Sequence, residues 1–286
     1  MFLFAALSAM TAYTTWLAVA WLALITLRKG YVQGTQVLAV VLLARFAVSL
    51  AAMMPKYAAL SAIMTFLPCF MAALVLRYSQ SWRAVSALFF VQVLLAALWI
   101  QVGKPNFIMA QYLLVQDAIR ALSNDGVLSG VLIDSTRLNE VVLANYLFGV
   151  QAAGVCISSA LSLMLARAMQ ARLFNPGGFK QEMRSFRGDK IGLILLVVMV
   201  VAASDNHLLA INVIPVLIGY FVFAGMSLAA VMFARKKAVS TLCLLVVPML
   251  LTPFVILPLY ALMGMIDSLF NIRLYLPAQV GNNVRG

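Results

Sequence analysis

Long apolar runs, separated by short polar or basic stretches, repeat along the whole chain. A helix that crosses a bilayer needs about 20 mostly apolar residues. Eight runs approach this length, at about residues 4–27, 35–54, 57–76, 84–103, 142–166, 190–204, 208–234 and 239–265. The sixth run is short, and the polar residues 204–207 after it indicate a tight turn. The pattern predicts an all-α polytopic transmembrane bundle of about eight spans, forming a single transmembrane domain over 1–286.

Prolines mark several boundaries between these runs, as helix breakers do. Others lie inside predicted spans, where neighbouring helices compensate for the lost backbone hydrogen bond. The last run contains three of them, Pro248, Pro253 and Pro258. We therefore expect the span at 239–265 to be one kinked helix.

The segment at 107–140 is amphipathic rather than uniformly apolar. Its first half repeats apolar residues at alternating steps of four and three, which is one face of a helix. These residues are Ile108, Tyr112, Val115, Ile119 and Leu122. A second such stretch, at about 128–142, leads into the fifth span. Three interpretations stay open: the segment lies in the membrane interface, caps the mouth of the bundle, or only connects two spans.

Composition excludes a water-soluble protein. Hydrophobic residues make up 65% of the 286 positions and charged residues only 10%, whereas a soluble domain is roughly half apolar and a quarter charged. The formal net charge of +12 does not indicate a nucleic-acid partner, because the basic residues lie between apolar runs and form no stripe with interleaved aromatics. The expected surroundings are therefore the lipid bilayer.

The distribution of Lys and Arg predicts an orientation, because cytoplasmic loops carry an excess of both. With eight spans, the loops at 28–34, 77–83, 167–190 and 235–238 share one side and carry 13 basic residues. The opposite side carries 6, including Lys104 and Arg273, and Arg45 lies inside a span. This bias predicts both termini on the non-cytoplasmic side of a bacterial cytoplasmic (inner) membrane. The N-terminus lacks the features of a cleaved signal peptide, so we expect a retained first span.

Residues that could carry chemistry are few. His207 is the only histidine and lies in a polar turn, and the three cysteines lie scattered within apolar runs. Such cysteines predict neither a disulfide framework nor a metal site. No phosphate-binding glycine-rich loop and no zinc-protease motif occurs. We therefore predict no catalytic residue, no metal and no cofactor, and we expect the protein not to be an enzyme.

Arg45 is the candidate substrate-binding residue. It lies near the middle of the span at 35–54, where a guanidinium costs at least a few kcal/mol unless it faces a partner or a cavity. One interpretation is an anion-binding site in an internal cavity. The others are a buried structural pair and a span edge placed wrongly. Gln92, Gln101 and Gln151 could add polar lining or bridge helices.

The basic loop at 167–190 is the second candidate. Asn175, Pro176, Gly177 and Gly178 predict a turn, since Pro fixes φ and Gly admits positive φ. A short helix should follow, with apolar residues on one face and basic residues on another. The apolar set is Phe179, Met183 and Phe186, and the basic set is Lys180, Arg184 and Arg187. This arrangement suits anionic lipid headgroups, and docking of a cytoplasmic partner protein is the alternative.

This loop resembles the signature of the YybS-like family of bacterial membrane proteins. The positions that match are Asn175, Pro176, Gly177, Gly178, Phe179 and Glu182, while Met183 stands where that family usually has an aromatic residue. The tail at 264–273 is similar to the family's closing Gly-x-x-Asp-x-x-x-x-x-Arg pattern, through Asp267 and Arg273. The resemblance covers about 160–190 and 258–273. That family is similar in general appearance to the substrate-binding components of energy-coupling-factor transporters, and it has no established activity to transfer.

These observations favour a membrane protein without catalytic activity, a small-molecule transport or solute-binding subunit that lacks its own energy source. Energy coupling would then require a separate subunit, because the chain has no nucleotide-binding loop. The alternative is a membrane scaffold that recruits a cytoplasmic partner through the loop at 167–190. An enzyme acting on lipid is the third possibility.

Overall fold

The structure is a computed structural model that describes residues 15–51, 55–104, 106–122, 139–233 and 238–275. Within these ranges it is helical apart from short connections, and it contains no strand. Six of the described helices are long and apolar enough to cross a membrane. The predicted all-α class is confirmed, and the chain is an integral membrane protein; the number of eight spans stays a prediction.

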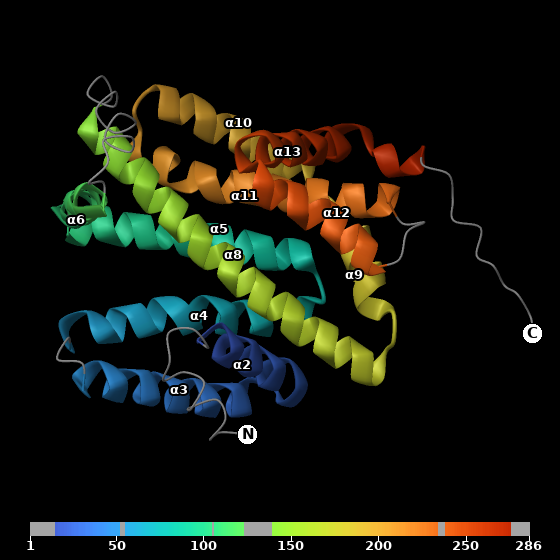
Figure 1. Ribbon diagram of the computed structural model, residues 1–286, viewed down its shortest axis with the longest axis horizontal. Coiled ribbons are helices and arrows are strands. Elements are labelled where there is room, and N and C mark those ends of the chain that lie inside the picture. The colour runs from blue at the N-terminus through green and yellow to red at the C-terminus, as the bar shows by residue number, and fades with distance from the viewer. Residues whose placement is uncertain (1–14, 52–54, 105, 123–138, 234–237, 276–286) are drawn as a thin grey trace, which may run out of the picture. The chain divides into compact units, whose positions relative to one another are not determined.

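The chain divides into two compact units, and each has its own packing. The first comprises residues 1–179 and 196–217, and the second comprises residues 180–195 and 218–286. The helices of the first unit are α2 (Thr15–Lys29), α3 (Tyr31–Ala51), α4 (Pro55–Ser79), α5 (Trp82–Gly103), α6 (Asn106–Leu122) and α8 (Glu140–Phe174) (Figure 1). Of the first predicted span, only the part from residue 15 onward lies within the described residues.

Helix α2 forms the centre of the first unit, where it packs against α3, α4 and α8. Its small and branched residues Ala18, Leu22 and Ala23 are fully buried, and small residues let neighbouring helices approach closely. A backbone carbonyl at the end of α2 accepts a hydrogen bond from another helix. Arg77 of α4 donates from Nη1 to the carbonyl oxygen of Leu27 at 2.5 Å. An arginine near a helix C-terminus pairs with carbonyls that have no partner within the helix.

Helix α8 is much longer than the span predicted at 142–166. Its 35 residues rise about 52 Å at 1.5 Å per residue, against a hydrocarbon core of about 30 Å. It continues to Phe174, so the first third of the segment predicted as a basic loop is helical. The predicted turn and short helix that follow are confirmed: Gly177 has φ +92°, and α9 covers Gly178–Ser185.

The predicted amphipathic segment is helical at α6, and its second stretch lies mostly outside the described residues. Helix α6 places its predicted apolar face against the bundle. Ile108 and Tyr112 are buried in a cluster with Ile100 of α5 and Ala144 of α8. This helix therefore covers the ends of two spanning helices.

The second unit contains most of α9, the beginning of α10 (Lys190–Ser204), the later part of α11 (Leu208–Met232), and three elements after it. These are α12 (Ala238–Leu251), α13 (Pro253–Phe270) and the 3₁₀ turn η3 (Ile272–Leu274). Helix α10 has only 15 residues, or about 22 Å of rise, which is less than the roughly 30 Å of the hydrocarbon core.

Helices α11 and α13 cross at two glycines. A Cβ on Gly225 would overlap the carbonyl of Tyr260, and a Cβ on Gly264 would overlap the carbonyl of Phe221. Glycine at both positions lets the two backbones touch, as in other close helix crossings within membranes. Arg273, just after α13, reaches Ser227 near the end of α11 at 3.2 Å, so the two helices run in the same direction.

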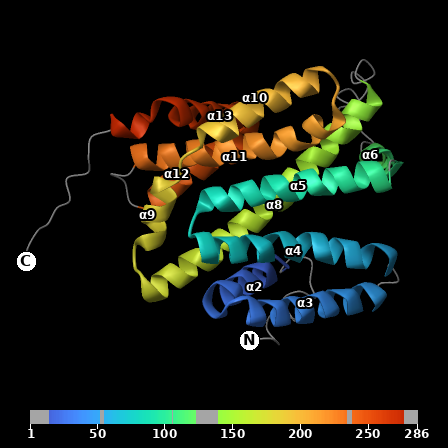
Figure 2. The same cartoon turned by 180° about the vertical axis from the view of Figure 1, so that it is seen from behind.

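The prediction of one kinked helix at 239–265 is wrong. The Tyr260 hydroxyl donates to the carbonyl oxygen of Leu245 at 3.1 Å, whereas one continuous helix would separate these residues by about 22 Å. The chain instead reverses at Thr252, which has φ −134° and ψ 63°. Pro253 has no N–H to continue the first helix and begins the second. Helices α12 and α13 therefore form an antiparallel pair, which Figures 1 and 2 show from opposite sides.

This reversal also corrects one assignment of side. The eight-span count put Arg273 across the membrane from the loop that contains Arg184. The guanidinium of Arg273 instead donates to the carbonyl oxygens of Arg184 and Phe186. The last described residues therefore lie next to that loop within the second unit.

Candidate functional site

A cavity of about 460 Å³ lies among four helices of the first unit. This volume is within the usual range of small-molecule sites, roughly 300–1,000 Å³. Its walls come from α4, α5, α6 and α8, and most of the side chains are apolar or aromatic. They are Met64, Pro68, Gln92, Val93, Ala96, Trp99, Ile100, Lys104, Phe107, Gln111, Phe148, Gln151, Ala152, Val155 and Cys156.

One face of α5 supplies the longest wall. Gln92, Ala96, Ile100 and Lys104 recur every four residues, and this spacing places them above one another on a helix. The twelve residues from Gln92 to Lys104 correspond to about 18 Å of rise. The cavity is therefore elongated along the helix axis, with an amide toward one end and an ammonium at the other.

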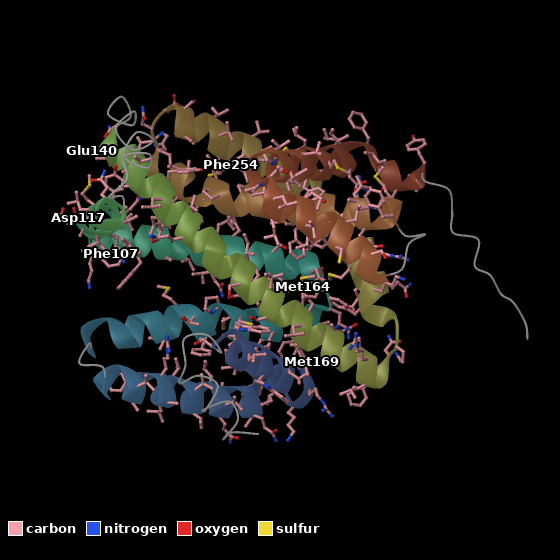
Figure 3. All side chains as sticks on the ribbon, in the orientation of Figure 1. Phe107, Asp117, Glu140, Met164, Met169 and Phe254 are labelled. Atoms are coloured by element: carbon pink, nitrogen blue, oxygen red, sulfur yellow. The ribbon has the colours of Figure 1, made fainter. Side chains whose placement is uncertain are left out.

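Helix α6 closes the end of the cavity beside Lys104. The backbone N–H of Phe107 donates to the Lys104 carbonyl oxygen at 2.9 Å, which turns the chain directly from α5 into α6. The Ile108 and Tyr112 face then packs on the bundle, while Phe107 and Gln111 line the cavity. Figure 3 shows Phe107 at the end of the first unit where α6 and the start of α8 lie.

The polar groups of the cavity are three amides and one cation. The Oε1 atom of Gln92 is buried and accepts no hydrogen bond from the described residues. A buried carbonyl oxygen without a donor costs about 1–3 kcal/mol, and this atom has almost no accessible surface, so an occupant of the cavity does not reach it. Among the described residues, Lys104 is the only charged residue of the lining.

The structure places two of the predicted polar lining residues, Gln92 and Gln151, on this cavity. Gln101 is not part of the lining. The substrate-binding candidate Arg45 is half-buried in α3, and α3 contributes no residue to the walls. Sequence reasoning missed Lys104 as a site residue, because a Lys-Pro pair at the end of an apolar run is also an ordinary boundary signal.

A cluster of arginines in the second unit brings together several of the other candidates. Arg187 follows α9 and donates from Nε to the carbonyl oxygen of Asp267 at 2.8 Å, and from Nη2 to that of Ser268 at 2.9 Å. These carbonyls belong to the last turn of α13, and that of Asp267 also accepts from the backbone N–H of Asn271 at 3.1 Å. Arg187 therefore caps α13 from a position about 80 residues earlier in the chain.

Arg273 holds the same helix end from the other direction. Its Nε lies 2.9 Å from Oδ2 of Asp267, which is fully buried. Its Nη2 donates to the Phe186 carbonyl oxygen at 2.6 Å. The Ser227 hydroxyl donates to the same carbonyl at 2.8 Å. The arginine cluster, defined as Arg187, Arg273, Asp267 and Ser227, therefore joins three separate segments.

Phe186 lies inside this arrangement and not on the surface. Its ring packs edge-to-face against Tyr220 and Phe223, with centroids 5.8 and 6.0 Å apart. The Tyr220 hydroxyl accepts from the backbone N–H of Asp189 at 2.8 Å. Phe186 is therefore not accessible to lipid or to a partner protein in this structure, and the side chain of Arg187 is engaged with α13.

The remaining predicted residues of the loop at 167–190 lie at the end of α8, in the turn after it and in α9. Asn175 ends α8, and its backbone N–H donates to the carbonyl oxygen of Ala171 at 2.8 Å. Pro176 and Gly177 are exposed in the turn, and a Cβ on Gly178 would overlap the Asn175 side chain. Phe179, Glu182 and Arg184 are half-buried.

The resemblance thus pointed to residues that the fold brings together, Asp267 and Arg273 with the backbone of Arg184 and Phe186. Ser227 and Tyr220 complete the arrangement and carried no sequence signal, since a lone hydroxyl in an apolar helix is common. In comparisons with known proteins, no protein-family model matches the chain, and neither a curated protein nor a solved structure is significantly similar to it.

Proposed function

We propose that this chain binds a small, mainly apolar molecule in the cavity among α4, α5, α6 and α8, as a transport or solute-binding subunit without catalytic activity. The observation that carries the proposal is a cavity of about 460 Å³ whose walls are mainly apolar and include the amide residues Gln92, Gln111 and Gln151. A mainly apolar pocket of this size with a few polar groups is the usual form of a small-molecule site.

The proposed setting is the cytoplasmic membrane of a bacterium, with the basic loop in the cytoplasm. In that orientation the cavity end beside Lys104 faces the outer side, and a solute enters from there. The chain has no nucleotide-binding loop, so accumulation against a gradient requires a separate energy-coupling subunit.

Recruitment of a cytoplasmic partner through the loop at 167–190 receives less support. Two of the residues expected to make that contact, Phe186 and Arg187, are used within the second unit. The arginine cluster therefore has a structural explanation that does not require a partner.

Filling the cavity tests the proposal. Ala152→Phe adds a ring from α8, and we expect it to remove at least about 90% of any small molecule that copurifies with the wild type. The bound material is measured by mass spectrometry of an organic extract. Ala47→Phe is the matched control, because Ala47 is exposed on α3.

Ala96→Phe fills the same cavity from α5 and should act like Ala152→Phe. Thermal melting of each purified variant shows whether the fold is retained. If both folded variants carry the same amount of the same compound as the wild type, the cavity is not the binding site and the proposal is wrong.

A further inference from the structure

The turn between α12 and α13 is apolar and exposed. Four of its side chains are between 66% and 93% exposed, those of Leu250, Leu251, Phe254 and Val255. Leu250 and Leu251 are consecutive, so their side chains point about 100° apart around α12. The hairpin tip, defined as residues 250–255, is therefore exposed on more than one face, and Figure 3 shows Phe254 at this end of the hairpin. A docked protein would cover one face, whereas lipid would surround the tip.

The hairpin tip satisfies its own polar groups. Its only polar side chain is that of Thr252, whose hydroxyl donates to the Pro248 carbonyl oxygen at 3.1 Å. The Thr252 N–H donates to the same oxygen at 2.9 Å, and the N–H groups of Val255 and Ile256 donate to the Thr252 carbonyl oxygen at 3.2 and 3.0 Å. Pro253 has no N–H to satisfy. Such a turn suits a medium without water, where each unpaired backbone group is costly.

The turn between α10 and α11 has the opposite composition. Residues 204–207 are Ser, Asp, Asn and His, and all four are exposed. Polar residues are usual where a turn meets water, because the backbone groups of a turn need polar partners. The chain therefore has a polar turn at one point and an apolar turn at the other, and this difference indicates different surroundings.

Both helices of the hairpin are shorter than the hydrocarbon core is thick. Helix α12 has 14 residues and α13 has 18, which rise about 21 and 27 Å against about 30 Å. No charged residue occurs from 238 to 266, whereas basic residues at 235–237 and Arg273 flank the two ends. Basic side chains favour the headgroup region. Because the two helices are antiparallel, both flanks belong at the same face of the membrane.

We propose that α12 and α13 form a re-entrant hairpin whose tip lies within the hydrocarbon core and contacts lipid acyl chains. The shorter helix ends about 9 Å before the far side of the core, the difference between 30 and 21 Å. The apolar run at 239–265 then makes no complete crossing of the membrane. The hairpin belongs to the second unit, so failure of this proposal leaves the cavity of the first unit unaffected.

A spin label at the tip reports on the medium around it. Phe254→Cys is labelled in the full chain after the native cysteines are replaced, and the protein is placed in lipid nanodiscs. Collisions of the label with molecular oxygen, which dissolves in lipid, are compared with collisions with a water-soluble nickel chelate. We expect more collisions with oxygen than with the chelate. Because Phe254 is 93% exposed, the variant loses almost no packing and should melt like the wild type.

Two other labelled positions give the reference values. Leu95→Cys lies on an exposed part of α5, well inside this long apolar helix, and should favour oxygen as the tip does. Asn206→Cys lies in the polar turn after α10 and should favour the nickel chelate. Val255→Cys repeats the measurement at a second position of the tip.

Two results would overturn the proposal. Tip labels that favour the chelate, as Asn206→Cys should, would place the tip in water at the far face. Tip labels that collide little with either reagent would be covered by protein and not by lipid.

Discussion

Single side chains decide whether the end of α13 is held in place. Asp267 is fully buried and depends on Arg273 for a counter-charge. Arg273→Gln should lower the free energy of unfolding by roughly 3–5 kcal/mol, because removal of one partner leaves a buried charge without compensation. Chemical denaturation of the purified protein, followed by tryptophan fluorescence, measures this change.

The matched control for that variant is Arg172→Gln. Arg172 is an exposed arginine in the last turn of α8, and substitutions at such sites usually change stability by less than about 0.5 kcal/mol. Equal stability of Arg273→Gln and Arg172→Gln would show that the buried pair contributes nothing, contrary to expectation.

At this scale, sequence reasoning identified residue types better than their roles. A charge or an amide within an apolar run is visible in the sequence because its desolvation is costly, and this selected Arg45, Gln92 and Gln151. The same cost does not reveal which neighbours a side chain meets. Gln92 and Gln151 line the cavity and Arg45 does not, and that difference depends on helix rotation.

Among the elements, the crossing of α11 and α13 is the most sensitive to substitution. Gly264→Ala places a methyl group against the backbone of α11, and overpacking of this kind costs about 1–3 kcal/mol. Gly154→Ala is the control, because a Cβ there meets nothing within 4 Å. Thermal melting should show a clear loss for the first variant and none for the second. Equal melting temperatures would exclude a tight crossing.

Most of the described helices follow directly from hydropathy, since most of the long apolar runs coincide with one helix each. The reversal between α12 and α13 does not, because it occurs entirely within apolar sequence. Loops usually need polar residues to satisfy exposed backbone groups. Here one residue, Thr252, suffices: its backbone N–H and its hydroxyl both bond to the Pro248 carbonyl oxygen. The three prolines in 239–265 predicted that a helix there would be kinked, but they did not predict that the chain would reverse direction.

For the whole molecule, the structure predicts that the loop near Ser185 and the end of the described chain share one side of the membrane. Single cysteines at Ser185 and Tyr275, both exposed, should react with a membrane-impermeant maleimide under the same condition. Asn206, at the other end of α10, should react under the opposite one. The three native cysteines are replaced first. Labelling of Ser185→Cys and Tyr275→Cys from different sides would contradict the fold of the second unit.

The basic residues did not indicate where the chain turns back. Their distribution over the predicted loops gave a bias of 13 to 6, and that count depends on every predicted boundary. The reversal at Thr252 lies inside one apolar run, where no charge marks it.

The arginine cluster also has a consequence for how the protein is made. Arg187 emerges from the ribosome about 80 residues before the helix end that it caps, and its partners Asp267 and Ser268 are almost the last described residues to appear. Until those residues are made, Arg187 lacks the carbonyl oxygens that it binds in the folded structure. A chain cut short before residue 273 would retain the buried carboxylate of Asp267 without its cation. Chains truncated before residue 273 would therefore be less stable than full-length chains. A membrane protease could degrade them preferentially because they lack the ion pair between Arg273 and Asp267.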